Sequence, residues 1–249
     1  MMRALALLVC LLAVPATAQK RSGYDDTGPQ VRAMQDDDTA NPGFLWVQQG
    51  AMLWSQPAGG AGKSCADCHG GATTLRGVAA RYPAYDATRA RPVTLSQRIN
   101  ACRTDHQDAA PLASESVALL GLTAYVALQS RGLPMRVATD GVVRPFIEAG
   151  EKFFRTRQGQ LNLSCAQCHD DRAGQSLGGA LIPQGHANGY PQYRLEWQTM
   201  GSFTRRLRAC LTGVRAEPLA PDAPEAVALE LYLAARADGL PVEAPAVRP

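Results

Sequence analysis

The sequence predicts a mainly α-helical protein made of two similar units in tandem, with long loops, that arose by internal duplication. A five-residue motif at positions 65–69 recurs at 165–169, an offset of 100 residues. Periodic apolar stretches precede the related tracts 131–134 and 238–241, which favours a helix before each tract. The 23 glycines and 17 prolines among 249 residues indicate extensive loops.

Composition and charge narrow the functional classes. The chain is 46% hydrophobic and 19% charged, which suits one or two globular domains and argues against a disordered or collagen-like polymer. Its net charge of +3 is too small for the basic surface that nucleic-acid binding requires. Only 6% of the residues are aromatic, so something other than aromatic side chains must fill the space beneath the loops. We therefore expect a large cofactor and no nucleic-acid partner.

Residues 1–18 have the organisation of an export signal. Arg3 gives a positive start, residues 4–13 form an apolar run, and residues 16–18 (Ala-Thr-Ala) match a small-residue cleavage site. The run is shorter than the ~20 residues that cross a bilayer, and no later stretch is long and uncharged enough to do so. We expect a signal peptide, a mature chain starting near Gln19, and a periplasmic protein without a membrane span. An uncleaved anchor and a buried first helix are the alternatives.

The rest of the chain divides into an arm and the two units. Residues 19–43 are polar, contain the acidic run 36–38 and lack apolar periodicity, so we expect an extended arm, with disorder as the alternative. The first unit is assigned to residues 44–141 and the second to residues 142–249, each the size of a small domain.

Landmarks on both sides of the motif support the duplication. The matched pairs are 50–54 with 150–154, 82–85 with 190–193, 98–102 with 206–210, and 131–134 with 238–241. The first pair is expected to begin helices, and the glycine of the last pair is expected to end a helix in the left-handed conformation. The offset rises from 100 to 108 after the motif, so eight extra residues enter the second unit there.

The repeated motif reads C-x-x-C-H in both units. In such a motif two thiols bond to the vinyl groups of a haem, and the histidine that follows becomes an iron ligand. Zinc sites and redox C-x-x-C pairs are alternatives, but neither explains a histidine directly after both pairs. The sequence therefore predicts two cytochrome c-like domains with covalent haem, in which the motif residues are Cys65, Cys68 and His69, and Cys165, Cys168 and His169.

A second cysteine of each unit is a candidate for the other axial position of the iron. Cys102 and Cys210 each follow an arginine, Arg98 or Arg206, by four residues, which is one helical turn. A nearby guanidinium group and ferric iron both favour a thiolate, so each pair suits thiolate ligation. A Cys102–Cys210 disulfide, or free thiols with methionine as the ligand, are the alternatives. The nearby methionines are Met52 and Met200, whereas His106 and His186 have no counterpart in the other unit and are expected to be surface or pocket histidines.

Arginines surround Cys210 more densely than Cys102. Around Cys210 lie Arg205, Arg206, Arg208 and Arg215, whereas Cys102 has Arg98, Arg103 and the acidic Asp105. Such a run is usually a solvated helix face, but arginines beside a reactive sulfur also attract a small oxyanion. The second unit is therefore the predicted active site, and the first haem is expected to conduct electrons or to be a structural remnant.

These features together resemble the SoxA family, the dihaem c-type cytochrome subunits of SoxAX complexes in the Sox sulfur-oxidation pathway. The resemblance covers both units and rests on the two motifs, the paired arginine and cysteine tracts, and residues 206–210, 214–218 and 228–232. It implies an L-cysteine S-thiosulfotransferase with two covalently attached c-type haems. This enzyme couples thiosulfate oxidatively to a cysteine of the SoxYZ carrier protein and passes electrons to a cytochrome c acceptor. The resemblance also implies a heterodimer with SoxX, a smaller monohaem cytochrome.

The resemblance also implies roles for individual residues. Cys210 corresponds to the active-site cysteine, found as a persulfide in the family, and Arg206 corresponds to the substrate-binding arginine. The implied haem-attaching residues are Cys65, Cys68, Cys165 and Cys168, and the implied axial ligands are His69 with Cys102 and His169 with Cys210. A dihaem electron-transfer cytochrome without substrate chemistry is the alternative function, and a haem-based sensor with an open iron site is a third.

Overall fold

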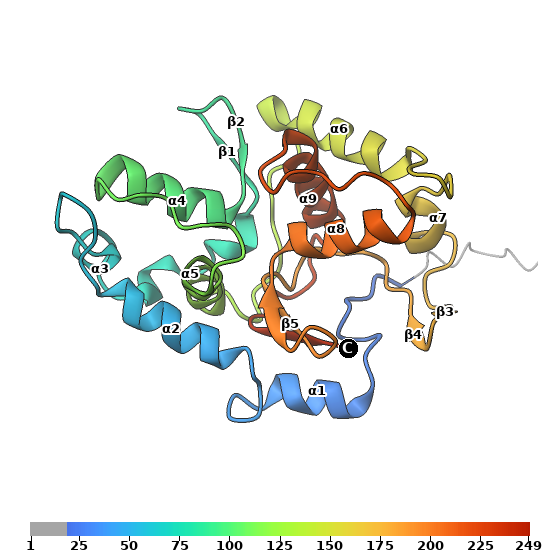
Figure 1. The fold of residues 1–249 in the computed structure, drawn as a ribbon, viewed down its shortest axis with the longest axis horizontal. Coiled ribbons are helices and arrows are strands. Elements are labelled where there is room, and N and C mark those ends of the chain that lie inside the picture. Colours follow the sequence, from blue (N-terminus) through green and yellow to red (C-terminus); the bar gives the residue numbers. More distant parts are fainter. Residues whose placement is uncertain (1–18) are drawn as a thin grey trace, which may run out of the picture.

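Two units with the same order of helices lie side by side in the computed structural model, which describes residues 19–249 (Figure 1). The export signal expected at 1–18 lies outside the described residues. The helices of the first unit are α2 (Phe44–Trp54), α3 (Cys65–His69), α4 (Leu95–His106) and α5 (Val117–Leu128). Those of the second are α6 (Arg144–Arg155), α7 (Cys165–His169), α8 (Phe203–Gly213) and α9 (Pro224–Arg236). The mainly helical, duplicated fold predicted from the sequence is confirmed.

Short strands and 3₁₀ helices occupy the loops. Each unit has an antiparallel hairpin before its third helix, β1 (Ala84–Asp86) with β2 (Arg91–Val93) and β5 (Gln192–Arg194) with β6 (Thr199–Gly201). A further hairpin, β3 (Ser176–Leu177) with β4 (Ala180–Leu181), lies where the second unit was expected to have extra residues. The 3₁₀ helices are Ala72–Leu75, Ala79–Arg81 and Gly141–Val143.

Glycine permits the closest helix crossing in each unit. Gly50 of α2 lies on the carbonyl of Gly121 in α5, and Gly150 of α6 lies on the carbonyl of Ala228 in α9, so closely that any Cβ would overlap the carbonyl oxygen. The sequence placed both glycines at a helix start, which is wrong. Helices α2 and α6 begin six residues earlier, at Phe44 and Arg144, and their glycines serve packing rather than initiation.

A pseudo-two-fold arrangement of backbone hydrogen bonds joins the two units. The tract after α5 runs antiparallel to the tract after α9, and Pro134 faces its own counterpart Pro241. Four backbone N–H groups donate to carbonyl oxygens across this junction, in two related pairs. In the first pair Gly132 donates to Val242 at 2.9 Å and Gly239 donates to Met135 at 3.0 Å. In the second pair Met135 donates to Leu240 and Val242 donates to Leu133, both at 2.8 Å.

The glycines of these tracts do have the expected positive φ, 79° at Gly132 and 84° at Gly239, but α5 and α9 end earlier, at Leu128 and Arg236. The left-handed turn therefore directs the chain into the junction instead of capping the helix.

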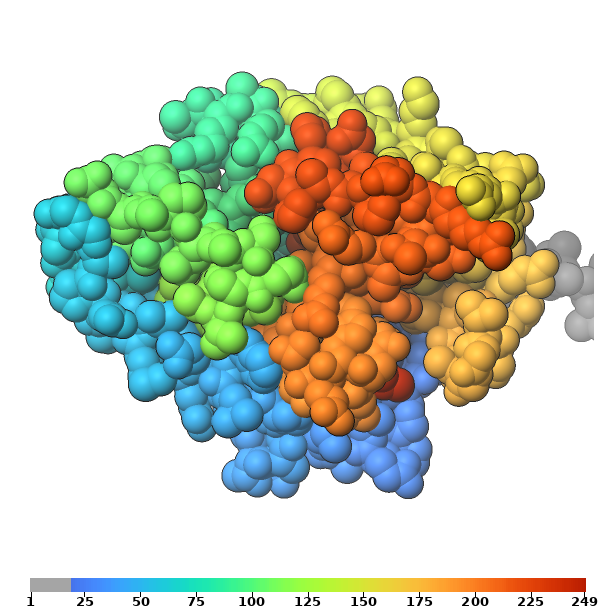
Figure 2. Space-filling view, in the orientation of Figure 1, coloured from blue at the N-terminus to red at the C-terminus, as the bar shows by residue number. Residues whose placement is uncertain are grey.

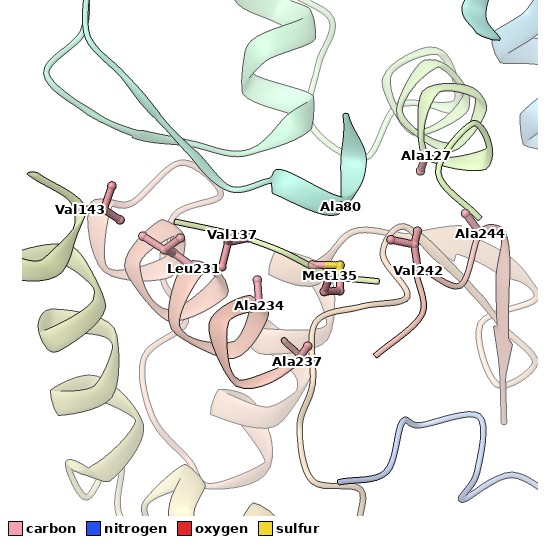
Figure 3. Close-up of a cluster of buried hydrophobic side chains, with 10 residues drawn as sticks. All are labelled: Ala80, Ala127, Met135, Val137, Val143, Leu231, Ala234, Ala237, Val242 and Ala244. Carbon is pink, nitrogen blue, oxygen red and sulfur yellow. The ribbon is translucent and has the colours of Figure 1, made fainter. Parts of the chain in front are cut away.

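A shared apolar core lies along this junction (Figure 3). Ala127 of α5 and Ala234 of α9 occupy equivalent positions and are both at most 1% exposed. Met135 and Val242, one from each tract, fill the same cluster. Met200 of β6 is fully buried against α2 and α5, so the hairpin of the second unit also packs on the first. The two units are therefore fixed relative to one another.

The N-terminal arm is ordered and partly helical, which corrects the expectation of an extended segment. It contains α1 (Pro29–Asp36), which begins at a proline and lies along the C-terminal strand β7 (Ala246–Arg248). The Gln35 side-chain oxygen accepts hydrogen bonds from the Val247 N–H at 2.9 Å and from Arg248 at 2.7 Å. Strand β7 in turn pairs in parallel with β5 in a three-stranded sheet of order β6-β5-β7. Apolar periodicity could not reveal this contact, because the polar side chain of Gln35 makes it with residues that lie more than 200 positions away in the sequence.

Candidate functional site

The two motif helices begin in the same way. Ser164 precedes α7 and its Oγ accepts a hydrogen bond from the Gln167 N–H at 3.3 Å, while the Gln167 side chain accepts one from the Ser164 N–H at 2.9 Å. Ser64 and Asp67 form the equivalent pair of bonds before α3. Reciprocal capping of this kind fixes a helix of little more than one turn. In such a turn the first cysteine, the second cysteine and the histidine share one face.

The histidine of the second unit is held by a loop. Nδ1 of His169 lies 2.7 Å from the Pro183 carbonyl oxygen, which requires that Nδ1 carries the proton and leaves Nε2 free. Gly185 has φ of 73°, and a Cβ there would come within 3.2 Å of the His169 ring. Burial lowers the pKa of His169, which favours the neutral, ligating form. This loop is part of the insertion that distinguishes the second unit.

The histidine of the first unit has a different environment. The His69 ring lies 5.9 Å from the Trp54 ring, and the Trp54 N–H donates to the Gly70 carbonyl at 2.9 Å. Within residues 19–249 the His69 ring makes no hydrogen bond. The shorter loop after α3 therefore supplies no acceptor equivalent to Pro183.

The donor set fits c-type haem. All six cysteines in the described part of the chain are free thiols, so the alternative of a Cys102–Cys210 disulfide is wrong and every motif thiol is available for haem attachment. Burial, followed by the charge of Cys210, raises the pKa of Cys165 to about 11. Burial and then the charge of Cys102 raise the pKa of Cys65 in the same way. Cys102 and Cys210 are therefore each close enough to the motif helix of their own unit to affect the pKa of its first cysteine.

The guanidinium group beside Cys102 favours the thiolate but does not outweigh the effect of burial. Burial raises the pKa of Cys102, and the opposing effect of Arg98 is too weak to reverse this. Arg98 is instead engaged by the buried Asp86, whose carboxylate lies 2.9 Å from the guanidinium group. Arg98 therefore acts in the expected direction on the Cys102 thiol, but burial has the larger effect.

Helix α8 positions Arg206 and Cys210 one turn apart. The helix begins after Ser202, whose Oγ accepts a hydrogen bond from the Arg205 N–H at 3.2 Å. Arg206 is 35% exposed, and its Nη1 lies 3.9 Å from the Glu196 carboxylate. The hairpin that carries Glu196 and helix α8 are neighbours on one face of the molecule, both in orange tones in Figure 2. The candidate site is thus open to solvent beside Arg206.

Sequence reasoning missed two residues near Cys210. The partly buried Tyr190 has a pKa raised to about 12, first by burial, with Arg206 and Arg194 opposing and Cys210 adding to the shift. Tyr190 was noted as a landmark, but no role was inferred for it. Arg194 occupies the position of Asp86 in the first unit, at the offset of 108. Comparing the two units residue by residue could have found it, because the charge reverses there.

The remaining candidates are not arranged as iron ligands. Met52 is 62% exposed, and Met200 packs among Val47, Leu120 and Ala124 rather than against a motif helix. His106 is exposed at the end of α4. The fourth candidate, His186, is half-buried and has a pKa lowered to about 4, mainly by burial and then by Arg236.

Comparison with known proteins places this fold in a family. The model of the SoxA/TsdA cytochrome c domain matches residues 49–135 and 149–242. The chain is 39% identical over 229 residues to the L-cysteine S-thiosulfotransferase subunit SoxA of Pseudaminobacter salicylatoxidans, covering 91% of this chain and 80% of that protein. It is 38% identical to the subunit of the same name from Rhodovulum sulfidophilum, covering 92% and 80%.

A solved structure agrees with these matches. The crystal structure of SoxXA from P. pantotrophus superimposes with a TM-score of 0.89 at 34% identity, covering 92% of this chain and 87% of that chain. Both units therefore have the cytochrome c-like fold that the motifs predicted, and c-type haem is the cofactor of the fold. The chain belongs to the SoxA family of cytochrome c-domain proteins.

Proposed function

We propose that this chain is the SoxA subunit of an L-cysteine S-thiosulfotransferase that couples thiosulfate oxidatively to a cysteine of a SoxYZ-like carrier protein. The names of its relatives support this activity. The observation that carries it is the placement of Arg206 and Cys210 one turn apart on α8, with Cys210 acting on the motif cysteine Cys165. A cation beside a sulfur that is near a haem-attaching cysteine suits an anionic sulfur substrate.

The reaction removes two electrons. The terminal sulfur of thiosulfate forms an S–S bond with the carrier cysteine, whose thiol loses its proton, and two electrons leave. When bound, the two covalently attached c-type haems supply the path for these electrons to a cytochrome c acceptor. The protein residues orient the substrate: Arg206 binds the sulfonate end, and Cys210, carried as a persulfide, presents its sulfur to the terminal sulfur.

The haem-binding residues follow from the motifs and the fold. Cys65 and Cys68 would attach the first haem, and His69 and Cys102 would hold its iron. Cys165 and Cys168 would attach the second, and His169 and Cys210 would hold its iron. The free Nε2 of His169 supports this assignment.

The proposed partners and location follow from the same relationship. We assign the chain to a heterodimer with a SoxX-like monohaem cytochrome, since the structural relative is a SoxXA complex. We also assign it to the periplasm, because residues 1–18 have the organisation of an export signal. No helix among residues 19–249 is long and apolar enough to cross a membrane.

Replacing Cys210 by Ala in the complex with its SoxX-like partner tests the function. Thiosulfate is supplied with the carrier protein and an oxidised cytochrome c, and the mass of the carrier reports coupling. We expect the variant to lose coupling while both haems remain attached. Cys102→Ala, the matched change in the first unit, is the comparison, because it removes an equivalent sulfur from the non-catalytic unit.

Coupling that survives in Cys210→Ala would contradict the transferase and favour an electron-transfer cytochrome. Intact mass and a peptide map of the exported protein provide a second reading. Two attached haems and an added sulfur on the Cys210 peptide are expected, and one haem would contradict the count.

A further inference from the structure

The two hairpins carry opposite charges at one equivalent position. Asp86 is the last residue of β1 and Arg194 is the last residue of β5. Their strands pair in the same register, Asp86 opposite Arg91 and Arg194 opposite Thr199. Each side chain is therefore presented from the same place in its unit, next to the third helix of that unit.

In the first unit this position neutralises the helix arginine. The Asp86 carboxylate is 3% exposed and lies 2.9 Å from Arg98, the equivalent of Arg206. The same carboxylate oxygen lies 3.1 Å from Arg89, and Arg89 reaches Asp105 at 2.6 Å. Two arginines and two carboxylates thus form a chain of ion pairs whose charges balance, which leaves no net positive charge in this group for an anion.

In the second unit the same position adds a cation. The Arg194 side chain is only 14% exposed, and its Nε donates to Glu196 at 2.7 Å. The same Glu196 oxygen lies 3.9 Å from Arg206. One carboxylate, itself 48% exposed, is thus shared by two guanidinium groups, and one positive charge is left in excess.

Packing fixes the Arg194 guanidinium group beside the site. It lies 5.3 Å from the centre of the Trp197 ring, and Arg205 lies 4.4 Å from the same ring. Burial and then the charge of Arg206 lower the pKa of Arg194, so the two guanidinium groups are close enough to repel one another. The charges of both groups also act on the partly buried Tyr190, as does that of Cys210. Arg194, Arg206 and Cys210 therefore lie in the same region of the second unit.

We propose that Arg194 is a second oxyanion-binding residue, which together with Arg206 binds the sulfonate group of thiosulfate next to Cys210. The inference rests on the proposed function and extends it. A sulfonate has three acceptor oxygens, and a pair of guanidinium groups can engage it with several charge-assisted hydrogen bonds. In the structure Glu196 accepts a hydrogen bond from Arg194 and lies at ion-pair distance from Arg206. The charge reversal from Asp86 to Arg194 restricts anion binding to the second unit.

Steady-state kinetics of the complete complex tests the role of Arg194. Thiosulfate is varied at saturating carrier, and Arg194→Gln is compared with the wild type and with Arg144→Gln, which makes the same charge change at an exposed position at the start of α6. Because a charge-assisted hydrogen bond is lost, we expect the KM for thiosulfate to rise about 10-fold or more in Arg194→Gln, with kcat changed by less than about 3-fold. Calorimetric titration with thiosulfate should show the same loss of affinity. Arg144→Gln should match the wild type in both.

The outcomes separate the inference from the proposed function. If the wild-type complex couples thiosulfate and Arg194→Gln has the same KM as the wild type, the role of Arg194 is overturned and the proposed function stands. If the wild-type complex couples no thiosulfate, the proposed function itself is overturned. If Arg194→Gln does not fold or does not retain haem, a crystal structure of the wild-type complex with thiosulfate decides. A sulfonate oxygen about 3 Å from an Arg194 nitrogen supports the inference, and a sulfonate bound out of hydrogen-bonding reach of Arg194 overturns it.

Discussion

The two units share a scaffold and differ where chemistry is expected. Both have the same four helices, the same capped motif turn and the same glycine crossing between their first and fourth helices. In the first unit the arginine of the third helix is paired with the buried Asp86. In the second, Arg194 stands at that position, and the arginine of α8 is left with an exposed carboxylate that it shares. Duplication supplied the haem-binding frame twice, and local changes of charge distinguish the unit that we propose to bind substrate.

The loops after the motif helices show a second difference. The longer loop of the second unit carries Pro183 onto Nδ1 of His169, whereas the shorter loop of the first leaves the His69 ring against Trp54. A hydrogen bond to a ligating histidine orients the ring and raises its basicity. The insertion therefore fixes the orientation and raises the basicity of the histidine in the second unit, and the described part of the first unit has no equivalent hydrogen bond.

The largest expected effect tests whether the scaffold is equivalent in the two units. Gly150→Val places a side chain against the Ala228 carbonyl, and Gly50→Val does the same against Gly121. We expect each to lower the free energy of unfolding by about 3 kcal/mol, measured by urea denaturation of the haem-loaded protein. Gly213→Ala at the end of α8, where a Cβ meets no atom within 4 Å, is the control. A unit that tolerated its valine would show that the crossings are not equivalent.

The next effect separates the two helix arginines. Arg206→Gln should weaken thiosulfate coupling by about 2 kcal/mol in kcat/KM, roughly 30-fold, since it removes a charged hydrogen bond to the substrate. Arg98→Gln should lower the melting temperature and leave the KM for thiosulfate unchanged, because Arg98 pairs with Asp86. Equal changes of KM in the two variants would remove the distinction between the units.

The smallest effect concerns a cavity of about 80 Å³ between the units, lined by Glu230 of α9 and its counterpart Thr123 of α5 among others. Burial raises the pKa of Glu230 from 4.5 to about 8. Between these pH values the folded protein binds more protons than the unfolded chain, so the free energy of unfolding falls as pH rises.

Glu230→Thr, which imports the residue of the first unit, should remove this contribution and be more stable than the wild type at pH 8. Glu230→Gln should behave similarly while preserving the side-chain size. Urea denaturation at pH 5 and pH 8 measures the change. If the variants keep the wild-type pH dependence, another group titrates in this range.

Much of the fold could be predicted because the sequence contains two copies of the same unit. The recurrence of the motif, and of the tracts around 102 and 210, determined the helical units and the candidate ligands without any contact information. The predicted helix boundaries were wrong where a residue type is compatible with two positions in a helix. Gly50 fits the start of a helix as well as its middle, and only the crossing with α5 shows which use applies.

What the sequence determined by itself was local: C-x-x-C-H spacing, the arginine one turn before each distal cysteine, and the duplication. Such features lie within one helical turn or repeat at a fixed interval, so chain geometry alone relates them. Only the tertiary structure decided that Pro183 holds His169, that Asp86 neutralises Arg98, and that Arg194 joins Arg206 near Cys210. These contacts connect separate elements, and their effect depends on distance and burial, which a linear pattern does not contain.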